Sequence, residues 1–425
     1  MRNKKTSRPE PPRRSRWRRI AAPLAILAAV LAAVLVLRWM LAPGDAPARM
    51  AAQARAQGEH AFFAPVQGDA GLPLADGHVQ RRRELLGNYQ LADHTYCSYR
   101  QSTQYPFNSR PIAENADRAN PNAPVTEMRP MHLQDGGADS AVQLQTSQSR
   151  VYLASGEAVA FSIRAVDASG QVLPLVITRT LAQGITYKGT RASAQVTVPF
   201  VDDGSGADPV PNDGAFAAIL APAQTGLAGF AGTIRTEVRY SVGGKNGALL
   251  FDVVYTPELP AMWSGPPREA VENGSLDFIL PAEVRMPGRY VIEGRVDDAK
   301  GRPFALVTFN DVLGPGPNAV KLAVFGKLMR DQDAALPLTL RDVDGYLLKE
   351  NADPDRAMMP RLEGKVYTSK AGSNQSFSNA EWQSEERTRY LNEFSKDVAK
   401  ARNALARFDP LAPLPASECF RTEAH

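Results

Sequence analysis

The stretch from residue 142 to residue 258 alternates apolar and polar side chains in one short run after another, as in "AVAFSIRAV", "ASAQVTVPFV" and "TIRTEVRYSV". Turn-forming sequences such as "DASGQ" and "GGKNG" separate the runs, and "GGKNG" predicts a tight hairpin. A period of two puts successive side chains on opposite faces of a strand. About seven such strands predict an Ig-like β-sandwich. No Cys…Trp…Cys trio is present, so antibody-type kinship is not supported.

A second β-rich unit is predicted for residues 275–350, after a proline-rich connector. Its sequence "YVIEGRVDDAKGRPFALVTF" can be laid beside "FSIRAVDASGQVLPLVIT" of the first unit. Each consists of an alternating strand, a turn with Asp and Gly, and an apolar strand. The fold class is therefore mainly β, with two Ig-like β-sandwich units.

A helix is predicted for residues 378–408, capped by Ser378 or Asn379 and ended by "DPLAPLP". Its apolar residues recur at helical spacing. We expect this face to pack on the β-units; the alternative is a partner-binding or coiled-coil helix. The face consists of Trp382, Tyr390, Leu391, Phe394, Val398 and Leu405.

The N-terminus carries nine basic residues within residues 1–19, followed by an apolar run. The run is long enough to cross a bilayer as a helix. Basic flanks stay in the cytoplasm. We therefore expect a cytoplasmic tail (1–19), a transmembrane signal anchor (20–41), and a periplasmic remainder in a bacterial cell. The alternative is a signal peptide cleaved near "APGDAPA".

Residues 42–141 are rich in Pro, Asn, Asp and Ala and predict an irregular linker that spans the distance from the membrane or drapes over a neighbouring domain. A short helix before Cys97 is compatible with this composition.

The only two cysteines, Cys97 and Cys419, both lie on the expected exported side. Disulfides persist in that environment, so we expect one bond between them; two free thiols are the alternative. Closing so long a loop stabilises a fold by about 4–5 kcal/mol at most. A zinc site does not fit two cysteines this far apart.

The net charge of +4 reflects the N-terminal tail. Ten of the 49 basic residues precede residue 39, which leaves 39 basic and 44 acidic residues elsewhere. Nothing beyond the tail is typical of a nucleic-acid-binding surface.

The stretch "FVDDGSGADPVPNDGAF" (200–216) is the best chemical candidate. Its four aspartates offer hard oxygen ligands for Ca²⁺, and its glycines allow tight turns. The alternative is a connection built from Asx turns, because the spacing is not that of an EF-hand. The candidate metal ligands are Asp202, Asp203, Asp208 and Asp213.

The same stretch resembles a loop of exported bacterial β-sandwich proteins of the choice-of-anchor X type. Asp202, Asp203 and Gly204 match the start of that loop, and "DGAF" matches its end, whereas "GAD" departs from the expected G-D. Further matches are "RYVIEGRVDDAKGRPFALVTF", "VKLAVFGKLMRD" and "LTLRDVDGY", although "ALPLTL" replaces a Gly-Pro-Tyr. The resemblance covers about residues 145–350 and implies an exported Ig-like architecture without a known activity.

The sequence contains no recognisable catalytic motif. The five histidines lie outside the two predicted β-units, and no G-x-S-x-G or H-E-x-x-H sequence is present. The sequence therefore predicts a non-enzymatic, membrane-anchored periplasmic module with an envelope protein as partner. The alternative is a module that binds calcium or carbohydrate, with exposed aromatics such as Trp263 as contacts; an envelope hydrolase is a third alternative.

Overall fold

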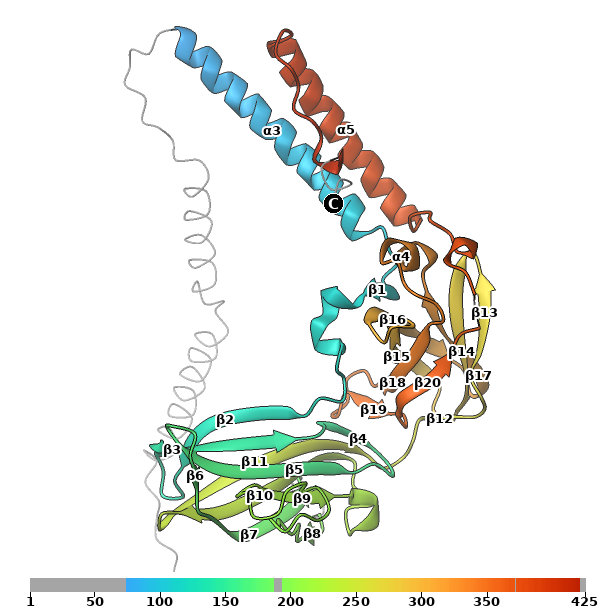
Figure 1. The fold of residues 1–425 in the computed structure, drawn as a ribbon. Coiled ribbons are helices and arrows are strands. Elements are labelled where there is room, and N and C mark those ends of the chain that lie inside the picture. Colours follow the sequence, from blue (N-terminus) through green and yellow to red (C-terminus); the bar gives the residue numbers. More distant parts are fainter. Residues whose placement is uncertain (1–73, 187–192, 371, 421–425) are drawn as a thin grey trace, which may run out of the picture. The chain divides into compact units, whose positions relative to one another are not determined.

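The computed structural model describes residues 74–186, 193–370 and 372–420. The predicted tail (1–19) and anchor (20–41) lie outside these residues. Among the described helices, none combines the length and the apolar content that a bilayer crossing requires. The chain divides into two compact units, 1–84 and 85–425, and the description below concerns the second. It holds two pairs of β-sheets and a pair of long helices (Figure 1).

The first β-sandwich is built from two sheets, in the orders β4-β11-β10-β7-β8 and β2-β3-β5-β6, with β9 also paired to β5. Pairing is antiparallel except between β4 and β11. Apolar residues of both sheets, including Phe161, Phe251 and Tyr255, form one core. The strands are β2 (Val125–His132), β3 (Ala138–Gln148), β4 (Tyr152–Ala154), β5 (Val159–Asp167), β6 (Val172–Leu173), β7 (Leu175–Gly184), β8 (Gln195–Val196), β9 (Phe216–Leu220), β10 (Gly232–Val242) and β11 (Lys245–Thr256).

The second β-sandwich pairs the sheet β1-β16-β15-β18-β19 with the sheet β12-β14-β13; β20 joins β18 and β17 joins β14. Its core contains Phe278, Tyr290 and Leu340. The unit extends well beyond the predicted 275–350. The strands are β1 (Ser109–Pro111), β12 (Ala261–Trp263), β13 (Arg268–Glu272), β14 (Ser275–Val284), β15 (Gly288–Asp297), β16 (Pro303–Leu313), β17 (Gly316–Val324), β18 (Thr339–Leu348), β19 (Arg356–Met358) and β20 (Leu362–Thr368), with the short helix α4 (Gly326–Asp331) after β17.

Alternation in the sequence explains the strands. In β10 every second residue from Gly232 to Val242 is buried. The predicted hairpin joins β10 to β11 through Gly243 and Gly244, whose φ angles are 54° and 78°. A two-residue connection of this kind needs positive φ at both positions, which glycine adopts without a steric penalty.

The two "D-A-x-G" turns have the same structure. Asp167 accepts hydrogen bonds from the backbone N–H groups of Ser169 and Gln171, and Asp298 accepts the corresponding bonds from Lys300 and Arg302. The strands that follow begin alike, because β6 pairs with β5 as β16 pairs with β15. They then differ, since β6 is two residues long and the chain continues into β7, which pairs with β10 in the opposite sheet. The internal similarity therefore extends to the turn and the first pairs after it.

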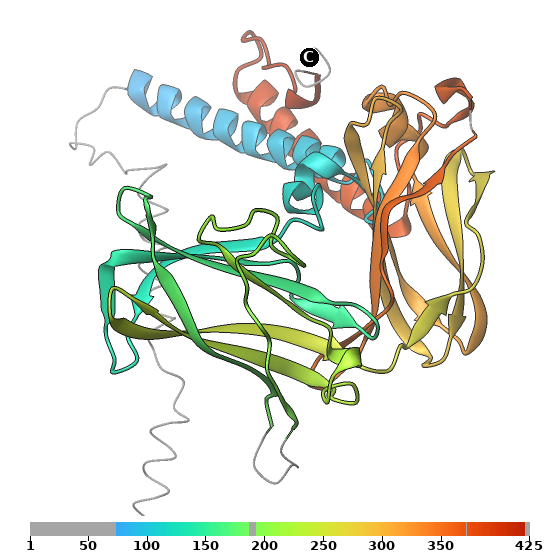
Figure 2. The same cartoon turned by 60° about the horizontal axis from the view of Figure 1, so that its bottom comes forward.

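The helix α3 (Leu74–Ser102), from residue 85 onward, lies beside the second long helix, α5 (Glu385–Phe408) (Figures 1 and 2). Helix α5 begins at the N-cap Ser384, whose hydroxyl accepts a hydrogen bond from Arg387 N–H at 3.0 Å. It starts later than the predicted residue 378, because Ser378 and Trp382 form backbone hydrogen bonds to Gly274 and Gln104.

The predicted apolar face of α5 packs on α3 rather than on a β-sheet. Leu405 contacts Leu85 and Tyr89 in one small core. Tyr390 and Phe394 contact the ring of Tyr99 edge-on, with centroid distances of 5.7 and 5.3 Å.

The range 42–141, predicted as irregular, contains all of α3, β1 and β2, and the start of β3. Helix α3 has its few apolar residues spread around its surface, so the sequence lacked the one-sided pattern on which helix prediction depends. Between β1 and β2, the turn η1 (Ile112–Arg118) and the following residues cross β15 and β18: Arg118 pairs with Glu293 at 2.7 Å and Asn122 bonds Asp342 at 3.0 Å. This part does drape over a neighbouring domain.

Candidate functional site

The aspartate loop (residues 200–216) connects the end of β8 to β9 and turns at Gly204, Gly206, Asn212 and Gly214, all of which have positive φ. Its carboxylates bind its own backbone. Asp202 accepts hydrogen bonds from the N–H groups of Asp213 and Gly214 at 3.2 and 3.0 Å, which closes the base of the loop.

Asp208, only 3% exposed, accepts hydrogen bonds from Gly204 and Val210 N–H. Asp213 accepts one from Ala215 N–H at 2.8 Å. The bonds from Val210 and Ala215, each two residues after its aspartate, are Asx turns of the kind expected for a plain connection.

Three of the four predicted metal ligands converge. Carboxylate oxygens of Asp202, Asp208 and Asp213 lie within 4.8 Å of one another. Asp203 stands apart from this group. It accepts hydrogen bonds from the hydroxyl and backbone N–H of Ser205, and these hold the pKa of its carboxyl below the ordinary value.

A groove of about 600 Å³ runs between the aspartate loop and the outer face of β2, β3 and β5. Asp208 and Asp213 line its loop side, and Glu127 and Arg164 line its sheet side. The Arg164 guanidinium lies 4.0 Å from the Asp213 carboxylate and donates hydrogen bonds to the Gln145 side chain. The groove therefore combines three carboxylates with a single cation among its described lining residues.

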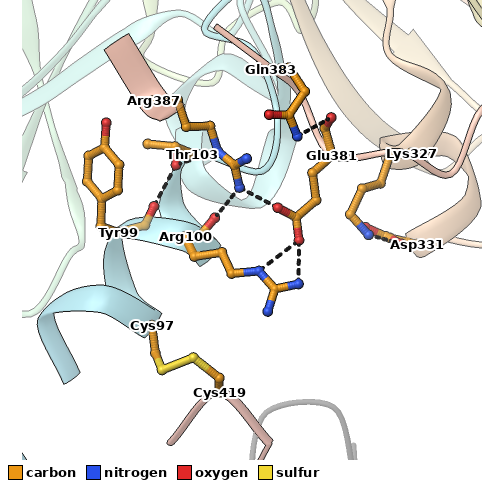
Figure 3. Close-up of polar contacts among 10 residues, drawn as sticks. All are labelled: Cys97, Tyr99, Arg100, Thr103, Lys327, Asp331, Glu381, Gln383, Arg387 and Cys419. Carbon is orange, nitrogen blue, oxygen red and sulfur yellow. Dashed lines mark hydrogen bonds and ion pairs between the residues drawn. A yellow bond between two sulfur atoms is a disulfide. The ribbon is translucent and has the colours of Figure 1, made fainter. Parts of the chain in front are cut away.

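Cys97 of α3 and Cys419 are joined in a disulfide, with their Cα atoms 5.1 Å apart (Figure 3). The predicted pairing is confirmed. Around the bond, the tail after α5 folds back along α3. Asp93, 5% exposed, accepts hydrogen bonds from the Ser417 hydroxyl and the Glu418 N–H, both at 2.7 Å. The His94 imidazole bonds the Glu418 carboxylate at 2.8 Å.

Beside the disulfide, a buried charge cluster joins α3 to α5 (Figure 3). The Arg387 side chain is 2% exposed and donates hydrogen bonds to the Glu381 carboxylate, the Thr103 hydroxyl and the Arg100 carbonyl. Arg100 binds the other Glu381 oxygen at 2.8 and 3.0 Å. Burial alone raises the pKa of Glu381, but these hydrogen bonds outweigh it and hold the pKa below its ordinary value.

A pocket of about 240 Å³ opens next to this cluster. Both cysteines line it, together with Arg100, Lys327 and Glu381. The Lys327 ammonium pairs with Asp331 at 3.0 Å. The sequence did not predict this cluster, because Arg100 and Arg387 come together only when α3 and α5 pair.

Contacts also join the two sandwiches. The Arg356 guanidinium in β19 lies 4.7 Å from the ring centroids of both Tyr152 in β4 and Tyr346 in β18. The Met358 N–H donates a hydrogen bond to the Thr256 hydroxyl at 3.1 Å. Near them Arg150 pairs with Glu363 at 2.6 Å.

Two carboxylates face each other across strands on the second sandwich, Glu293 of β15 and Asp344 of β18. Burial raises the pKa of each above its ordinary value, although Arg118 beside Glu293 and Arg361 beside Asp344 oppose the shift. The sequence did not indicate this pair, because Glu293 and Asp344 become neighbours only through the register of β15 with β18.

Two residues differ from what the sequence indicated. Trp263 is partly buried rather than exposed, and its Nε1–H donates a hydrogen bond to the Pro360 carbonyl at 2.8 Å. His132 ends β2 and so belongs to the first sandwich rather than to an irregular region.

No family model matches the chain, and no curated protein does. Among solved structures, a DUF4785 family protein from Legionella pneumophila is 12% identical, with a TM-score of 0.35 over 53% of this chain and 57% of that one. Elastase-activated alpha-2-macroglobulin from Escherichia coli is 13% identical, with a TM-score of 0.19 over 54% and 20%. A chimeric titin Z1Z2 carrying a decorin peptide is 11% identical, with a TM-score of 0.18 over 56% and 96%. The function is therefore inferred from the residues of this chain.

Proposed function

We propose that the protein is a non-enzymatic module of the bacterial envelope, with Ig-like β-sandwiches that contact a partner protein in the periplasm. Residues 20–41 anchor it in the inner membrane, and residues 1–19 face the cytoplasm. The Cys97–Cys419 disulfide supports an exported location, because such bonds persist in oxidising compartments.

One observation carries the non-enzymatic role: the side chains best equipped for chemistry hold the fold together. Cys97 is in the disulfide, and His94 binds Glu418. The loop aspartates bind loop N–H groups, and Arg387 and Glu381 bind each other between the helices. Groups engaged in this way supply surfaces of fixed shape rather than a reactive centre.

Site-specific photo-crosslinking in cells tests this role. A photoreactive residue replaces one exposed apolar side chain at a time: Val176 of β7, Ile219 of β9, Val271 of β13 or Val312 of β16. At least one position is expected to give a discrete adduct with the same envelope protein in repeated experiments. Absence of any adduct at all of these positions, and also at the exposed Met128 of β2, contradicts the role.

The topology has a separate test. A reporter that is active only outside the cytoplasm, fused after residue 60, is expected to give signal. A reporter that stays silent there, while the same fusion is produced in full length, contradicts the anchored and exported arrangement.

Calcium binding is a second candidate function, favoured by the convergence of Asp202, Asp208 and Asp213 within 4.8 Å beside the groove. Carboxylate oxygens are the ligands that calcium prefers. If calcium binds here, it uses the remaining lone pairs of the three carboxylates, each of which already accepts a backbone hydrogen bond.

Calorimetry of the chelator-treated protein with CaCl₂ tests this candidate. The parent is expected to release or absorb heat, Asp213→Asn to lose that signal, and Asp203→Asn to keep it. Asp203 is the matched control because it belongs to the same loop but not to the converging group. A flat trace for the parent excludes calcium binding.

A further inference from the structure

Strand β2 (Val125–His132) is an edge strand whose first half is exposed. It pairs with β3, and no other described strand pairs with it across Val125–Arg129. Val125 is 47% exposed and Met128 is 63% exposed. A strand edge presents unpaired backbone N–H and C=O groups, which another chain can use as a template.

The accessible edge has a defined end. Pro130 has no backbone N–H, and the register with β3 shifts between Pro130 and Met131. Beyond this bulge, the chain turns toward β11, where Leu133 bridges Gly247. Five residues remain as a regular edge, which is about the length of an ordinary strand.

A groove lies on each side of this edge. Thr126 and Met128 line the groove of about 600 Å³ beside the aspartate loop. Val125, Glu127 and Arg129, which share one face of β2, line a second groove of about 250 Å³ between β2 and β11, and Glu127 borders both grooves. Alternate side chains of a strand point to opposite faces, so a strand added to β2 would direct its own alternate side chains into the two grooves.

The charges of the larger groove indicate the partner's chemistry. Glu127, Asp208 and Asp213 line it, and Arg164 is the one cation among its described lining residues. The Glu127 carboxylate is 53% exposed and contacts Arg129. A basic side chain complements this excess of carboxylates.

We propose that the free edge of β2 receives an extended peptide segment of another protein as an added strand, with a Lys or Arg side chain in the larger groove. This inference rests on the proposed role as an interaction module and specifies its docking site. Backbone hydrogen bonds supply affinity, and the two grooves select the side chains. Met128, an adaptable thioether that lines the larger groove, contacts the aliphatic stem of the incoming Lys or Arg side chain.

Peptide binding to the full-length protein in detergent tests the proposal. The probe is a heptapeptide of alternating Lys and Val with blocked ends, and its controls are the Glu/Val analogue and a Lys/Val peptide N-methylated at alternate residues. Only the first peptide is expected to bind. Glu127→Gln is expected to weaken that binding roughly two- to fivefold. Equal binding of the N-methylated peptide, or no binding of the first one, overturns the proposal.

Crosslinking in cells separates this inference from the wider role. A photoreactive residue at Met128 is expected to capture the partner, and the adduct is expected to weaken in the Glu127→Gln background. Adducts at Val176, which lines neither groove, but none at Met128 would refute docking on β2 and leave the wider role intact. Absence of adducts at every position would refute both.

Discussion

The guanidinium of Arg387, near the start of α5, is hydrogen-bonded to the carboxylate of Glu381 in the segment that leads into the helix. The pair also reaches α3 through Thr103 and Arg100. Since the Arg387 side chain is 2% exposed, its hydrogen bonds to a charged group count strongly toward stability.

Replacement of Arg387 by Met is expected to lower the free energy of unfolding by about 2–3 kcal/mol, because the partly buried Glu381 carboxylate loses one of its two cationic partners and the Thr103 and Arg100 acceptors lose their donor. Urea denaturation measures the change. Arg389→Met is the matched control: Arg389 pairs with Glu385 at 3.4 Å on the exposed side of the same helix, and its loss is expected to cost less than about 0.5 kcal/mol. Equal effects of both changes would contradict the assigned role of Arg387.

Asp344→Asn is expected to stabilise the protein at neutral pH. Burial raises the pKa of Asp344, so the folded state disfavours its charged form. That cost is fully present above the folded pKa and vanishes below the ordinary value of 3.8, where the carboxyl is protonated in both states. The gain is therefore expected to reach up to about 1 kcal/mol at pH 7 and to disappear near pH 3.

Denaturant titrations at the two pH values measure this difference. Asp355→Asn serves as the comparison, since hydrogen bonds from Arg356 lower the pKa of Asp355. That variant is expected to be less stable than the parent at pH 7. A loss of stability for Asp344→Asn at pH 7 would show that its attraction to Arg361 outweighs the cost of burial.

Gly170→Ala and Gly301→Ala are each expected to destabilise the fold by about 1–2 kcal/mol. Their φ angles are 84° and 75°, and a Cβ at either position meets no atom within 4 Å, so the backbone conformation alone sets the cost. Gly87→Ala in α3 also meets no atom, but it has helical geometry and is expected to stabilise the protein by about 0.5–1 kcal/mol. Thermal unfolding is expected to show a lower melting temperature for Gly170→Ala and Gly301→Ala and a higher one for Gly87→Ala.

Loss of the Cys97–Cys419 bond is expected to reduce stability by about 2–5 kcal/mol, since the unfolded chain gains freedom that the bond removes. The double change to Ser, compared with the parent under non-reducing conditions, measures the effect. Mass spectrometry of unreduced digests is expected to show the two cysteine peptides linked. Two alkylatable thiols in protein purified from the envelope would contradict the bond.

Local patterns predicted much of this fold. The alternation of β10, the Gly243–Gly244 turn and the pairing of two cysteines are each dictated by a few residues, and each is present in the structure. The sequence indicated only a short helix before Cys97 where α3 runs for 29 residues, because the burial of α3 comes from α5, more than 280 residues later, rather than from a one-sided apolar stripe.

The candidate site was harder to predict, because it too depends on contacts between residues that are distant in sequence. Asp202, Asp208 and Asp213 were predicted as metal ligands from their closeness in sequence, and their carboxylates do converge. It could not show that Asp203 stands apart, since this depends on how Gly204 and Gly206 turn the chain. The edge of β2 and the pairing of Glu293 with Asp344 depend on strand order and register, which local patterns leave open.

The disulfide also changes the topology of the molecule. Because Cys97 and Cys419 are 322 residues apart, both sandwiches and α5 belong to one covalent ring. A protease that cuts once within this ring opens it into a linear molecule without releasing a fragment. Where proteases are present, a nicked copy would keep both sandwiches and α5 attached until a reductant or a second cut separates them.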